Sequence, residues 1–516
     1  MSNIMSQKIK TPDELAKIVD RLKKEGKKVV QCHGVFDLVH PGHIYHFESA
    51  KREGDVLIVS ITADKFVNKG PDYPIFSDTI RAKSLSSLEI VDYVIINHDF
   101  TAIKLLKKIK PTIYFKGQEY ESALKDKKRN LYKEAEAIKS VGGEIKFSHE
   151  PTYSSTNFLK NHFDIYPPKV KKFLDDFKLK HSSEELISDL ESLKEMKILI
   201  IGETIIDEYY YCKGMGKIPK DNLVATKYLN HETFAGGVLA CANHLAGFCD
   251  NLHLVTVLGK KASINSGQDY ENFIKENLNS GINSKFFYDR NGQTIIKRRF
   301  IDPAFFNKMF EIYYFDDKKL PESISSEIDN YLEKVISNYD LVIVNDYGHG
   351  FFNENIIKTI REKAKFLAVN VQTNSANFGF NLITKYSNPD YVCIDEPEAR
   401  LAVCQKDGDI SEVVRKIFEN TGAKKLIITH GHLGSVASGK KGEIYKIPVL
   451  SNKVVDRLGA GDAFFVVSAA LSAKNLPIEV IGFIGNVVGA IQVSTVGNKS
   501  SISFSQVCKF IKTLLK

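Results

Sequence analysis

The sequence lacks the features that mark membrane-spanning and disulfide-stabilised proteins. No stretch approaches the roughly 18 uninterrupted apolar residues that a transmembrane helix needs. The N-terminal segment MSNIMSQKIKTPDEL has no apolar core of signal-peptide length. The seven cysteines are scattered without a CxxC pair, which argues against a disulfide framework and for a reducing compartment. We therefore expect a cytoplasmic protein that has no membrane partner.

A strong excess of charge of one sign is also absent. The 71 Lys and Arg residues against 63 Asp and Glu residues leave a net charge of +8 on 516 residues. The basic runs, such as Lys125–Arg129 and Lys169–Lys172, are short and contain no interleaved aromatic residues. This pattern is typical of a solvated surface, although anionic phosphate substrates would also benefit from it. We expect no nucleic-acid partner.

The length exceeds that of a single ordinary core, so two or three domains are expected. In the first segment, apolar runs typical of strands alternate with a helical pattern at His43–Lys51. Such continuous apolar runs indicate an α/β fold, with a parallel sheet that is covered on both faces. The predicted strands are Lys28–Cys32, Asp55–Thr62, Asp92–Asn97 and Thr112–Phe115.

The pattern changes between Asn161 and Met196, where Pro167 and Pro168 precede the stretch DLESLKEMK, which we interpret as a leading helix. A second α/β alternation begins with KILIIGE at Lys197. We therefore predict a domain over residues 1–162, a linker with its helix over 163–196, and a second domain over 197–516. Predicted strands of the second domain include Leu252–Leu258, Asp340–Asn345, Phe366–Val371, Tyr391–Ile394 and Lys425–Thr429.

The first candidate site is the segment HGVFDLVHPGH, which begins at His33 after a predicted strand. Pro41 suits the first turn of a helix, so His40 and His43 should lie beside backbone N–H groups that attract anions. Gly42 has no side chain and lets a phosphate approach the backbone. The two imidazoles can then donate hydrogen bonds to an α-phosphate whose charge grows during displacement. The alternative, two polar residues at a helix start, does not explain the flanking GVFD.

This segment resembles the cytidylyltransferase-like nucleotidyltransferases, whose pattern is GxFDxxHxGH. The resemblance implies a Rossmann-like fold, and an attack by a sugar 1-phosphate on the α-phosphorus of a nucleoside triphosphate with release of pyrophosphate. It also implies Mg²⁺ held mainly by the nucleotide phosphates, without direct protein ligands. Because His33 replaces the usual Asn or Tyr, the choice between ATP and CTP stays open. The implied nucleotide-binding residues are Gly34, Phe36, Asp37, His40, Gly42, His43, Lys69, Arg81, Ser155 and Thr156, with His40, His43 and Lys116 also assigned to catalysis.

The second candidate site is the segment DRLGAGDAFF near the C-terminus. Gly459, Ala460 and Gly461 can present successive N–H groups at a helix start, where a transferring phosphoryl group develops charge. Asp462 then lies on the first helical turn, where it can accept the proton of a substrate hydroxyl. A glycine-rich turn with an Asp at a helix start is the structural alternative.

The segment resembles the GAGD signature of ribokinase-like carbohydrate kinases, which implies an α/β domain with a small β lid and ATP as donor. Gln372 and Asp395 depart from the family pattern, which has Lys and Asn there, so the substrate pocket is not standard. Arg298 and its neighbour Arg299 fit two roles: they could bind a phosphate on the sugar, or they could be exposed basic residues of a lid strand. The resemblance implies Asp207, Gly236, Gly237 and Arg298 as sugar-binding residues, and Thr429, Glu398, Gly431, Gly434 and Asn486 as nucleotide-binding residues.

Together the halves resemble bifunctional heptose-phosphate kinase and heptose-1-phosphate adenylyltransferase enzymes, with the domain order reversed. The resemblance implies that the protein makes an NDP-activated sugar for surface-polysaccharide synthesis, and that it forms a homodimer. Two alternatives stay open: a CTP-dependent cytidylyltransferase for another sugar or polyol phosphate, and a kinase-like domain that is divergent or regulatory. An aminoacyl-tRNA synthetase is disfavoured because no KMSKS-like stretch occurs.

Overall fold

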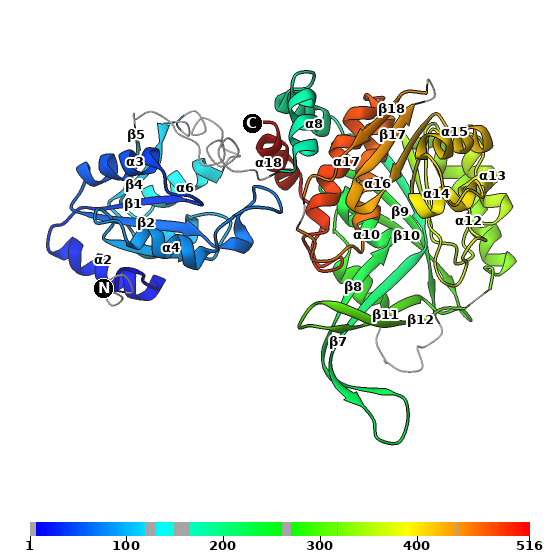
Figure 1. Ribbon diagram of the computed structural model, residues 1–516, viewed down its shortest axis with the longest axis horizontal. Helices are drawn as coiled ribbons and strands as arrows, with labels where there is room; N and C mark the ends of the chain where they lie inside the picture. The colour runs from blue at the N-terminus through cyan, green and yellow to red at the C-terminus, as the bar shows by residue number, and fades with distance from the viewer. Residues whose placement is uncertain are drawn as a thin grey trace. The chain divides into compact units, whose positions relative to one another are not determined.

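The computed structural model describes residues 7–118, 121, 130–148, 166–260, 270–316, 318–439, 442–451 and 453–516. Internal contacts divide the chain into two compact units at Pro167 and Pro168 (Figure 1). Each unit is an α/β domain, which confirms the predicted fold class. Among the described residues, no helix combines the length and the apolarity that a membrane crossing requires.

In the described part of the N-terminal unit, five parallel strands form one sheet in the order β3-β2-β1-β4-β5. The chain first builds outward from β1 to β3 and then returns to the other side of β1 with β4. Ligands of such sheets bind at the carboxyl ends of the two strands that flank this reversal. The strands are β1 Val29–Gly34, β2 Val56–Thr62, β3 Tyr93–Asn97, β4 Ile113–Gly117 and β5 Glu144–Ser148.

Helices cover both faces of this sheet, which explains the continuous apolar runs of its strands. On β2, Leu57, Val59 and Ile61 join a cluster with α3 and α4, whereas Val56 and Ile58 join a second cluster with α2 and α5. Alternate residues of a strand point to opposite faces, so one strand supplies both clusters. The helices are α2 Pro12–Lys24, α3 Pro41–Arg52, α4 Asp78–Ser86, α5 Ile103–Ile109 and α6 Asn130–Lys139, with a 3₁₀ turn η1 at Asp64–Phe66.

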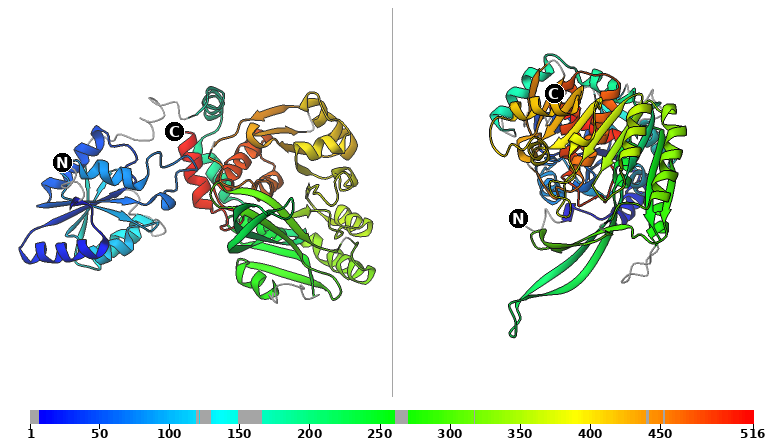
Figure 2. Two further views of the ribbon diagram at one scale, coloured as in Figure 1. Left: turned by 60° about the horizontal axis from the view of Figure 1, so that its bottom comes forward. Right: turned by 90° about the vertical axis from the view of Figure 1, so that its right-hand side faces the viewer.

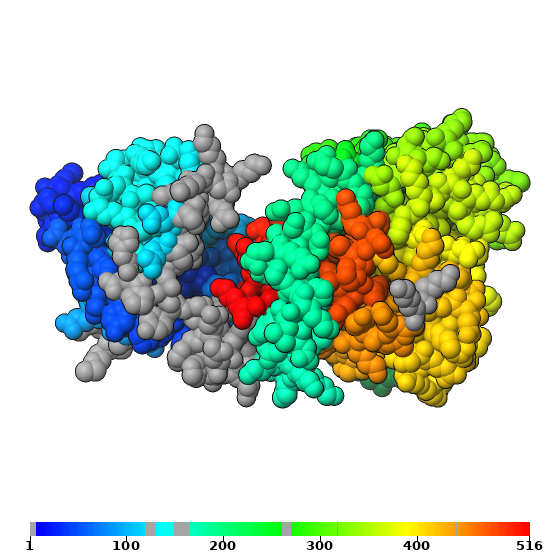
Figure 3. Space-filling model, turned by 90° about the horizontal axis from the view of Figure 1, so that it is seen from above, coloured from blue at the N-terminus to red at the C-terminus, as the bar shows by residue number. Residues whose placement is uncertain are grey.

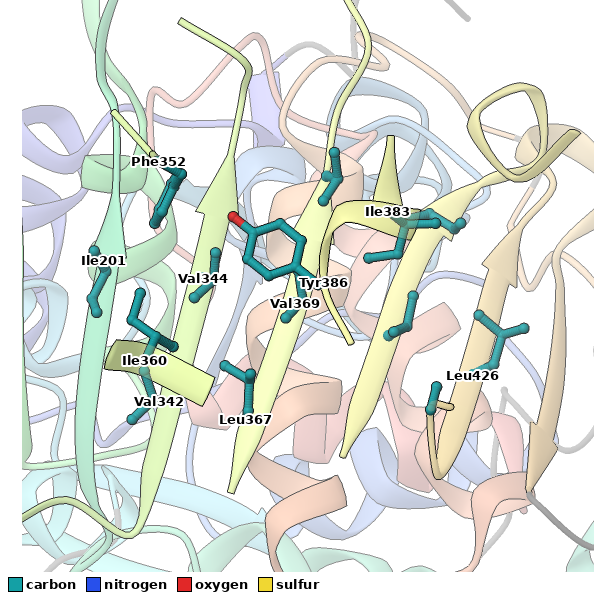
Figure 4. Close-up of a cluster of buried hydrophobic side chains, with 14 of the residues drawn as sticks. Ile201, Val342, Val344, Phe352, Ile360, Leu367, Val369, Ile383, Tyr386 and Leu426 are labelled. Atoms are coloured by element: carbon teal, nitrogen blue, oxygen red, sulfur yellow. The ribbon is translucent and has the colours of Figure 1, made fainter. Parts of the chain in front are cut away.

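The main sheet of the C-terminal unit has nine strands among the described residues, in the order β10-β9-β6-β13-β14-β15-β16-β17-β18. It is parallel up to β16, and β17 and β18 are antiparallel. Figure 4 shows buried side chains such as Val344 on β13, Val369 on β14 and Leu426 on β16. The strands are β6 Lys197–Gly202, β9 Asn251–Gly259, β10 Ile282–Asp289, β13 Leu341–Asp346, β14 Leu367–Val371, β15 Tyr391–Asp395, β16 Lys425–Thr429, β17 Ser435–Gly439 and β18 Ile444–Ile447.

A second sheet of this unit forms the predicted lid. Its strands follow the order β12-β11-β7-β8, with β7 paired parallel to β11 and antiparallel to β8. The long hairpin of β7 and β8 extends beyond the other strands of the unit (Figures 1 and 2). Only Glu203 separates β6 from β7, so the core leads directly into the lid. The strands are β7 Thr204–Lys217, β8 Val224–Gly237, β11 Ile295–Asp302 and β12 Asn307–Tyr314.

Two helices that precede β6 belong to the C-terminal unit. The ring of Phe177 on α8 stacks on Phe483 of α17 with a centroid distance of 4.3 Å, and Figure 3 shows α8 and α9 against the C-terminal helices. Much of the predicted linker is therefore folded, and the helix predicted over DLESLKEMK ends at Glu191. The helices are α8 Pro168–Lys178, α9 Ser183–Glu191, α10 Val238–Leu245, α11 Tyr270–Asn277, α12 Glu322–Val335, α13 Glu354–Lys363, α14 Glu396–Ala402, α15 Ile410–Thr421, α16 Ala460–Ala473, α17 Ile478–Gln492 and α18 Phe504–Leu514, with 3₁₀ turns at Ile336–Asn338, Ile383–Lys385 and Gly431–Leu433.

Candidate active sites

The first site lies where β1 leads into α3. β1 ends at Gly34, where an added Cβ would lie 3.0 Å from the Phe36 ring. Phe36 has a φ of 49°, which turns the chain, and α3 begins at Pro41 with His40 as its N-cap and Gly42 in its first turn. The first amides of a helix point out of its N-terminus and attract phosphate. The local backbone therefore fits the predicted anion site.

His40 and His43 form one stacked pair at this helix start, with ring centroids 3.8 Å apart. Burial, together with His40, His46 and Lys69, lowers the pKa of His43 to about 3. The pKa of His40 is also lowered by burial. Both rings are thus neutral at pH 7, each with one N–H donor. A bound phosphate would raise both pKa values, because a nearby anion favours the protonated form.

Lys116 and His46 enlarge this basic cluster. Lys116 on β4 donates through Nζ to His33 O at 3.0 Å. Burial and then the charge of Lys116 lower the pKa of His46 to about 4. Sequence analysis did not select His46, although it follows His43 by three residues and so shares its helix face. The side chain of His33 contacts Ser60 Oγ at 3.0 Å on β2.

Two predicted nucleotide-binding residues are built into the surrounding framework. The Asp37 carboxylate accepts the amides of Ile75 and Phe76 at 2.9 and 3.0 Å. Arg81 was predicted to bind the nucleotide, but its guanidinium is buried and donates to Phe76 O, Val35 O, Thr62 O and Asp64. With its donors directed into the loops, Arg81 holds the ends of β1 and β2 rather than facing a ligand.

Lys69 is a further predicted residue of this site that the structure describes. Burial lowers the pKa of Lys69, and the nearby Asp37 partly offsets this effect. The charge of Lys69 also contributes to the lowered pKa of His43. Ser155 and Thr156 lie outside the described residues.

The second site lies at the start of α16. Gly459 is its N-cap at a φ of 77°, and a Cβ there would overlap Asn498 Oδ1. An added Cβ on Gly461 would meet nothing within 4 Å, so the space beside its backbone is open. The amides of Gly459, Ala460 and Gly461 therefore fit a transferring phosphoryl group.

Asp462 is held at this helix start by two donors. Its Oδ1 accepts from Gln372 Nε2 at 2.7 Å and from Tyr347 Oη at 3.1 Å. Burial raises the pKa of Asp462 to about 6, and the two donors limit the rise. The carboxylate is thus ionised at pH 7 but close enough to neutrality to accept a substrate proton. Sequence analysis noted Gln372 only as a departure from the family pattern and did not identify it as a partner of the base.

Asp207 on β7 acts on the second site through its charge, which contributes to the raised pKa of Asp462. Its Oδ1 accepts from Arg299 Nη1 at 2.5 Å. A Cβ added to Gly236 would overlap Asp207 Oδ2, and Gly237 follows at a φ of 56°. Gly236 therefore provides the room that the carboxylate occupies, whereas a Cβ on Gly237 would meet Glu203 O and Ile205.

Arg298 was predicted as a sugar-phosphate ligand, and the structure places it elsewhere. Its Nε donates to Glu208 at 2.6 Å, and its guanidinium lies over the Tyr210 ring. Arg299 and Lys297, on the other face of the same strand, lie beside Asp207. A strand directs alternate side chains to opposite faces, so only one of two adjacent arginines can face the site.

The predicted nucleotide residues form a polar group at the ends of β15 and β16. Glu398 accepts the amides of Asp395 and Thr373 at 2.9 and 3.0 Å, and burial raises its pKa to about 7. Thr429 Oγ1 donates to Asp395 Oδ1 at 3.2 Å. This group borders the strand ends where nucleotides bind in open α/β sheets.

Three further residues of the predicted nucleotide pocket differ in accessibility. A Cβ added to Gly434 would overlap Ile447 O, whereas one on Gly431 would meet nothing within 4 Å. Asn486 is buried, and its Nδ2 donates to Ser435 Oγ at 2.6 Å and Gly482 O at 2.8 Å. Its amide nitrogen therefore joins α17 to β17, and the predicted adenine contact finds no support in this geometry.

A further carboxylate, Glu203, was missed in the sequence. It accepts the amides of Tyr347 and His349 at 2.9 and 3.1 Å, and burial together with Asp346 raises its pKa to about 7. It thereby fixes the loop that carries Tyr347, a partner of Asp462. Within the part of the chain that the structure describes, no group of three or more His, Cys, Asp or Glu residues is arranged to hold a metal ion.

The fold and these two clusters define a two-unit α/β protein with a candidate phosphate site at a helix start in each unit. Residues 195–504 match the model of the pfkB family of carbohydrate kinases. Because this match covers more than half of the chain, the protein belongs to that family. Residues 32–161 match the cytidylyltransferase-like model.

The curated relatives match the N-terminal part of the chain. Bifunctional protein HldE of Aliarcobacter butzleri is 44% identical over 115 residues, which is 22% of this chain and 24% of the relative. The protein of the same name in Gluconobacter oxydans is 35% identical over 135 residues, which is 26% of this chain and 27% of the relative. The matched segment thus spans about a quarter of these relatives. Phosphofructokinase-2 from Escherichia coli aligns with a TM-score of 0.50 at 12% identity, covering 62% of this chain and all of that one, and shows the shared fold alone.

Replacement of His43 by Ala should lower nucleotidyl transfer by roughly a hundredfold, because it removes a positioned donor to the developing charge. The measurement is pyrophosphate release by the full-length chain. The control is His98→Ala, because His98 is exposed and follows β3, outside the segment that carries the histidine pair. Equal rates for the His43 variant and the wild type would contradict this role.

Replacement of Gly236 by Ala should displace the Asp207 carboxylate and raise the KM for the sugar by about tenfold to a hundredfold, the cost of losing a charged hydrogen bond. Gly214→Ala, on the same hairpin, is the matched control, because a Cβ there meets nothing within 4 Å. Similar KM values for the two variants would refute the arrangement.

Kinase turnover should fall as the pH drops through about 6, since Asp462 becomes protonated below its raised pKa. Gln372→Leu removes a donor that favours the ionised form, so it should move this acid limb to higher pH. The measurement is kcat/KM as a function of pH, with Gln405→Leu, at a half-buried glutamine that contacts Glu412 and Lys416, as control. An acid limb that stays in place in the Gln372 variant would count against the assignment.

Proposed function

We propose that this protein is a bifunctional enzyme of activated-sugar synthesis. Its C-terminal unit phosphorylates a sugar or sugar phosphate, and its N-terminal unit transfers a nucleotidyl group onto the resulting sugar 1-phosphate. The observation that carries the kinase half is Asp462, a half-buried carboxylate with a raised pKa at the open, glycine-rich start of α16. Family membership supports the same reading.

In the kinase site, Asp462 accepts the proton of a sugar hydroxyl as that oxygen attacks the γ-phosphorus of ATP, and ADP leaves. Tyr347 and Gln372 orient the carboxylate through its Oδ1, and the amides at the start of α16 stabilise the transferring charge. Lys297 and Arg299, on the Asp207 face of β11, suit a substrate that already carries a phosphate. Bound Mg²⁺ would neutralise the triphosphate charge.

In the nucleotidyltransferase site, a sugar 1-phosphate oxygen attacks the α-phosphorus, and the bond to pyrophosphate breaks. The attacking oxygen is already ionised, so no general base is required. His40, His43 and Lys116 can hold the charge that develops on the α-phosphate. This proposal rests on the stacked histidine pair at the start of α3 and on the cytidylyltransferase-like match.

A heptose phosphate is the substrate class that we propose, because the HldE relatives are 35–44% identical over the matched N-terminal segment. This makes an ADP-activated heptose for surface polysaccharide the favoured product. Exposed apolar residues on the lid hairpin, Met215, Leu223 and Val224, support a homodimer. We place the reactions in the cytoplasm, where the nucleotide donors occur.

The competing proposal is a CTP-dependent cytidylyltransferase for another sugar or polyol phosphate, joined to a regulatory kinase-like unit. The observation that favours it is the altered pocket, in which Gln372 already bonds to Asp462 and Asp395 stands at the N-cap of α14. A regulatory unit would bind its ligand without turning over ATP.

Incubation of the chain with sugar phosphates and each of ATP, CTP, GTP and UTP should yield one NDP-sugar, detected by mass spectrometry. Asp462→Asn should abolish sugar phosphorylation but keep nucleotidyl transfer to a supplied sugar 1-phosphate. His43→Ala should show the reverse, so each variant controls the other. An NDP-sugar made only with CTP, with no phosphorylation in any mixture, would favour the competing proposal.

A further inference from the structure

A buried carboxylate in the C-terminal unit joins the lid to the glycine-rich turn. Asp456 is 2% exposed and lies three residues before Gly459. Its Oδ1 accepts from Lys308 Nζ at 2.6 Å and from the Leu458 amide at 3.2 Å. Its Oδ2 accepts from Tyr209 Oη at 2.7 Å and from the Gly497 amide at 2.9 Å.

These four donors come from parts of the chain that are distant in sequence. Lys308 is on β12 and Tyr209 is on β7, two strands of the lid. Leu458 belongs to the turn that starts α16, and Gly497 follows α17. Asn498, the next residue, bounds the space beside Gly459. One carboxylate therefore connects two lid strands to both loops that surround the start of α16.

The charge balance of this group depends on Lys308. Burial raises the pKa of Asp456, but the donors, led by Lys308, outweigh this effect and lower the pKa below its ordinary value. The carboxylate is therefore ionised while it is almost fully enclosed. A buried anion requires a cation and several donors to be tolerated. Lys308 supplies that cation, and its own side chain is 34% exposed.

We propose that Lys308 is a positioning residue of the kinase site. Its ammonium, together with Asp456 and Tyr209, forms a latch that fixes the turn before α16 to the lid. The amides that receive the phosphoryl group are then in place only when the lid strands are in place. This inference rests on the proposed kinase function for its catalytic consequence, although not for the latch itself.

The latch differs from an ordinary surface ion pair. Exposed pairs contribute little, because water screens them and both side chains lose freedom. Here the acceptor is buried, and two backbone amides of the site use the same carboxylate. Loss of the cation should therefore loosen Leu458 and Gly497, which lie on either side of the start of α16. Loss of a surface lysine of the lid should not.

Hydrogen exchange tests the latch without any substrate. In the full-length chain, Lys308→Met should speed exchange in peptides that contain Leu458 and Gly497 by about tenfold or more, since their acceptor becomes a poorly compensated buried charge. Lys308→Arg should keep the protection. The matched control is Lys227→Met, an exposed lysine on β8 of the same sheet. Unchanged exchange in Lys308→Met, or an equal change in the control, would overturn the latch.

Steady-state kinetics tests its catalytic role. With ATP and a heptose phosphate, Lys308→Met should lower kcat by about tenfold or more, as expected for a displaced charge-stabilising group. KM should change less, and added methylammonium chloride should restore part of kcat. Pyrophosphate release by the N-terminal unit should stay constant, which reports that the chain is folded. An unchanged kcat would refute the positioning role.

The two tests separate the latch from the proposed kinase function. If the wild-type chain phosphorylates no sugar, the proposed function fails, and the exchange result still decides whether Lys308 holds the turn. If the wild type is active and exchange in Lys308→Met rises while kcat is unchanged, the inference about positioning fails and the kinase function stands.

Discussion

Backbone amides at the start of a helix are the groups on which both sites depend. Such amides have no partner within the helix, so they bind an anion only if side chains leave the space beside them open. Gly42 lies in the first turn of α3, and Gly461 lies in that of α16. In the N-terminal unit, the histidines add hydrogen-bond donors beside the proposed phosphate site. In the C-terminal unit, Asp462 adds a proton acceptor.

This constraint explains why several charged side chains around the two sites hydrogen-bond to the backbone of loops. Arg81 binds acceptors just after β1, at the end of β2, in η1 and before α4, and Glu203 binds the amides of Tyr347 and His349. Side chains cannot fill the space beside the amides of a helix start that binds a ligand. The loops around it are therefore held by charged side chains that hydrogen-bond to the backbone away from that space. The Asp456 latch also holds loop backbone in this way, since its carboxylate binds the Leu458 and Gly497 amides together with two lid side chains.

Sequence patterns were sufficient for several parallel strands of the two main sheets, because these strands depend on local apolar runs, whereas the roles of the site residues stay predictions. Apolar runs marked β2 and β13, and Gly459 and Gly236 stand where a Cβ would overlap a neighbour. The choice between Arg298 and Arg299 depends on which strand face meets the core, and it was wrong for Arg298 because no alternation of apolar residues fixes the face there. The roles of Gln372 and Asp456 depend on contacts between distant segments, which one sequence does not reveal.

Counting the nucleotide sites of the chain tests the central claim most directly. Titration calorimetry with non-hydrolysable ATP and CTP analogues should find two sites per chain. Gly461→Asp should remove one of them, because the added carboxylate enters open space beside the α16 amides and repels a phosphate. His43→Ala should lower the nucleotide affinity of the other site and leave the α16 site unchanged. A single site in the wild type, or two sites that survive Gly461→Asp unchanged, would contradict the account.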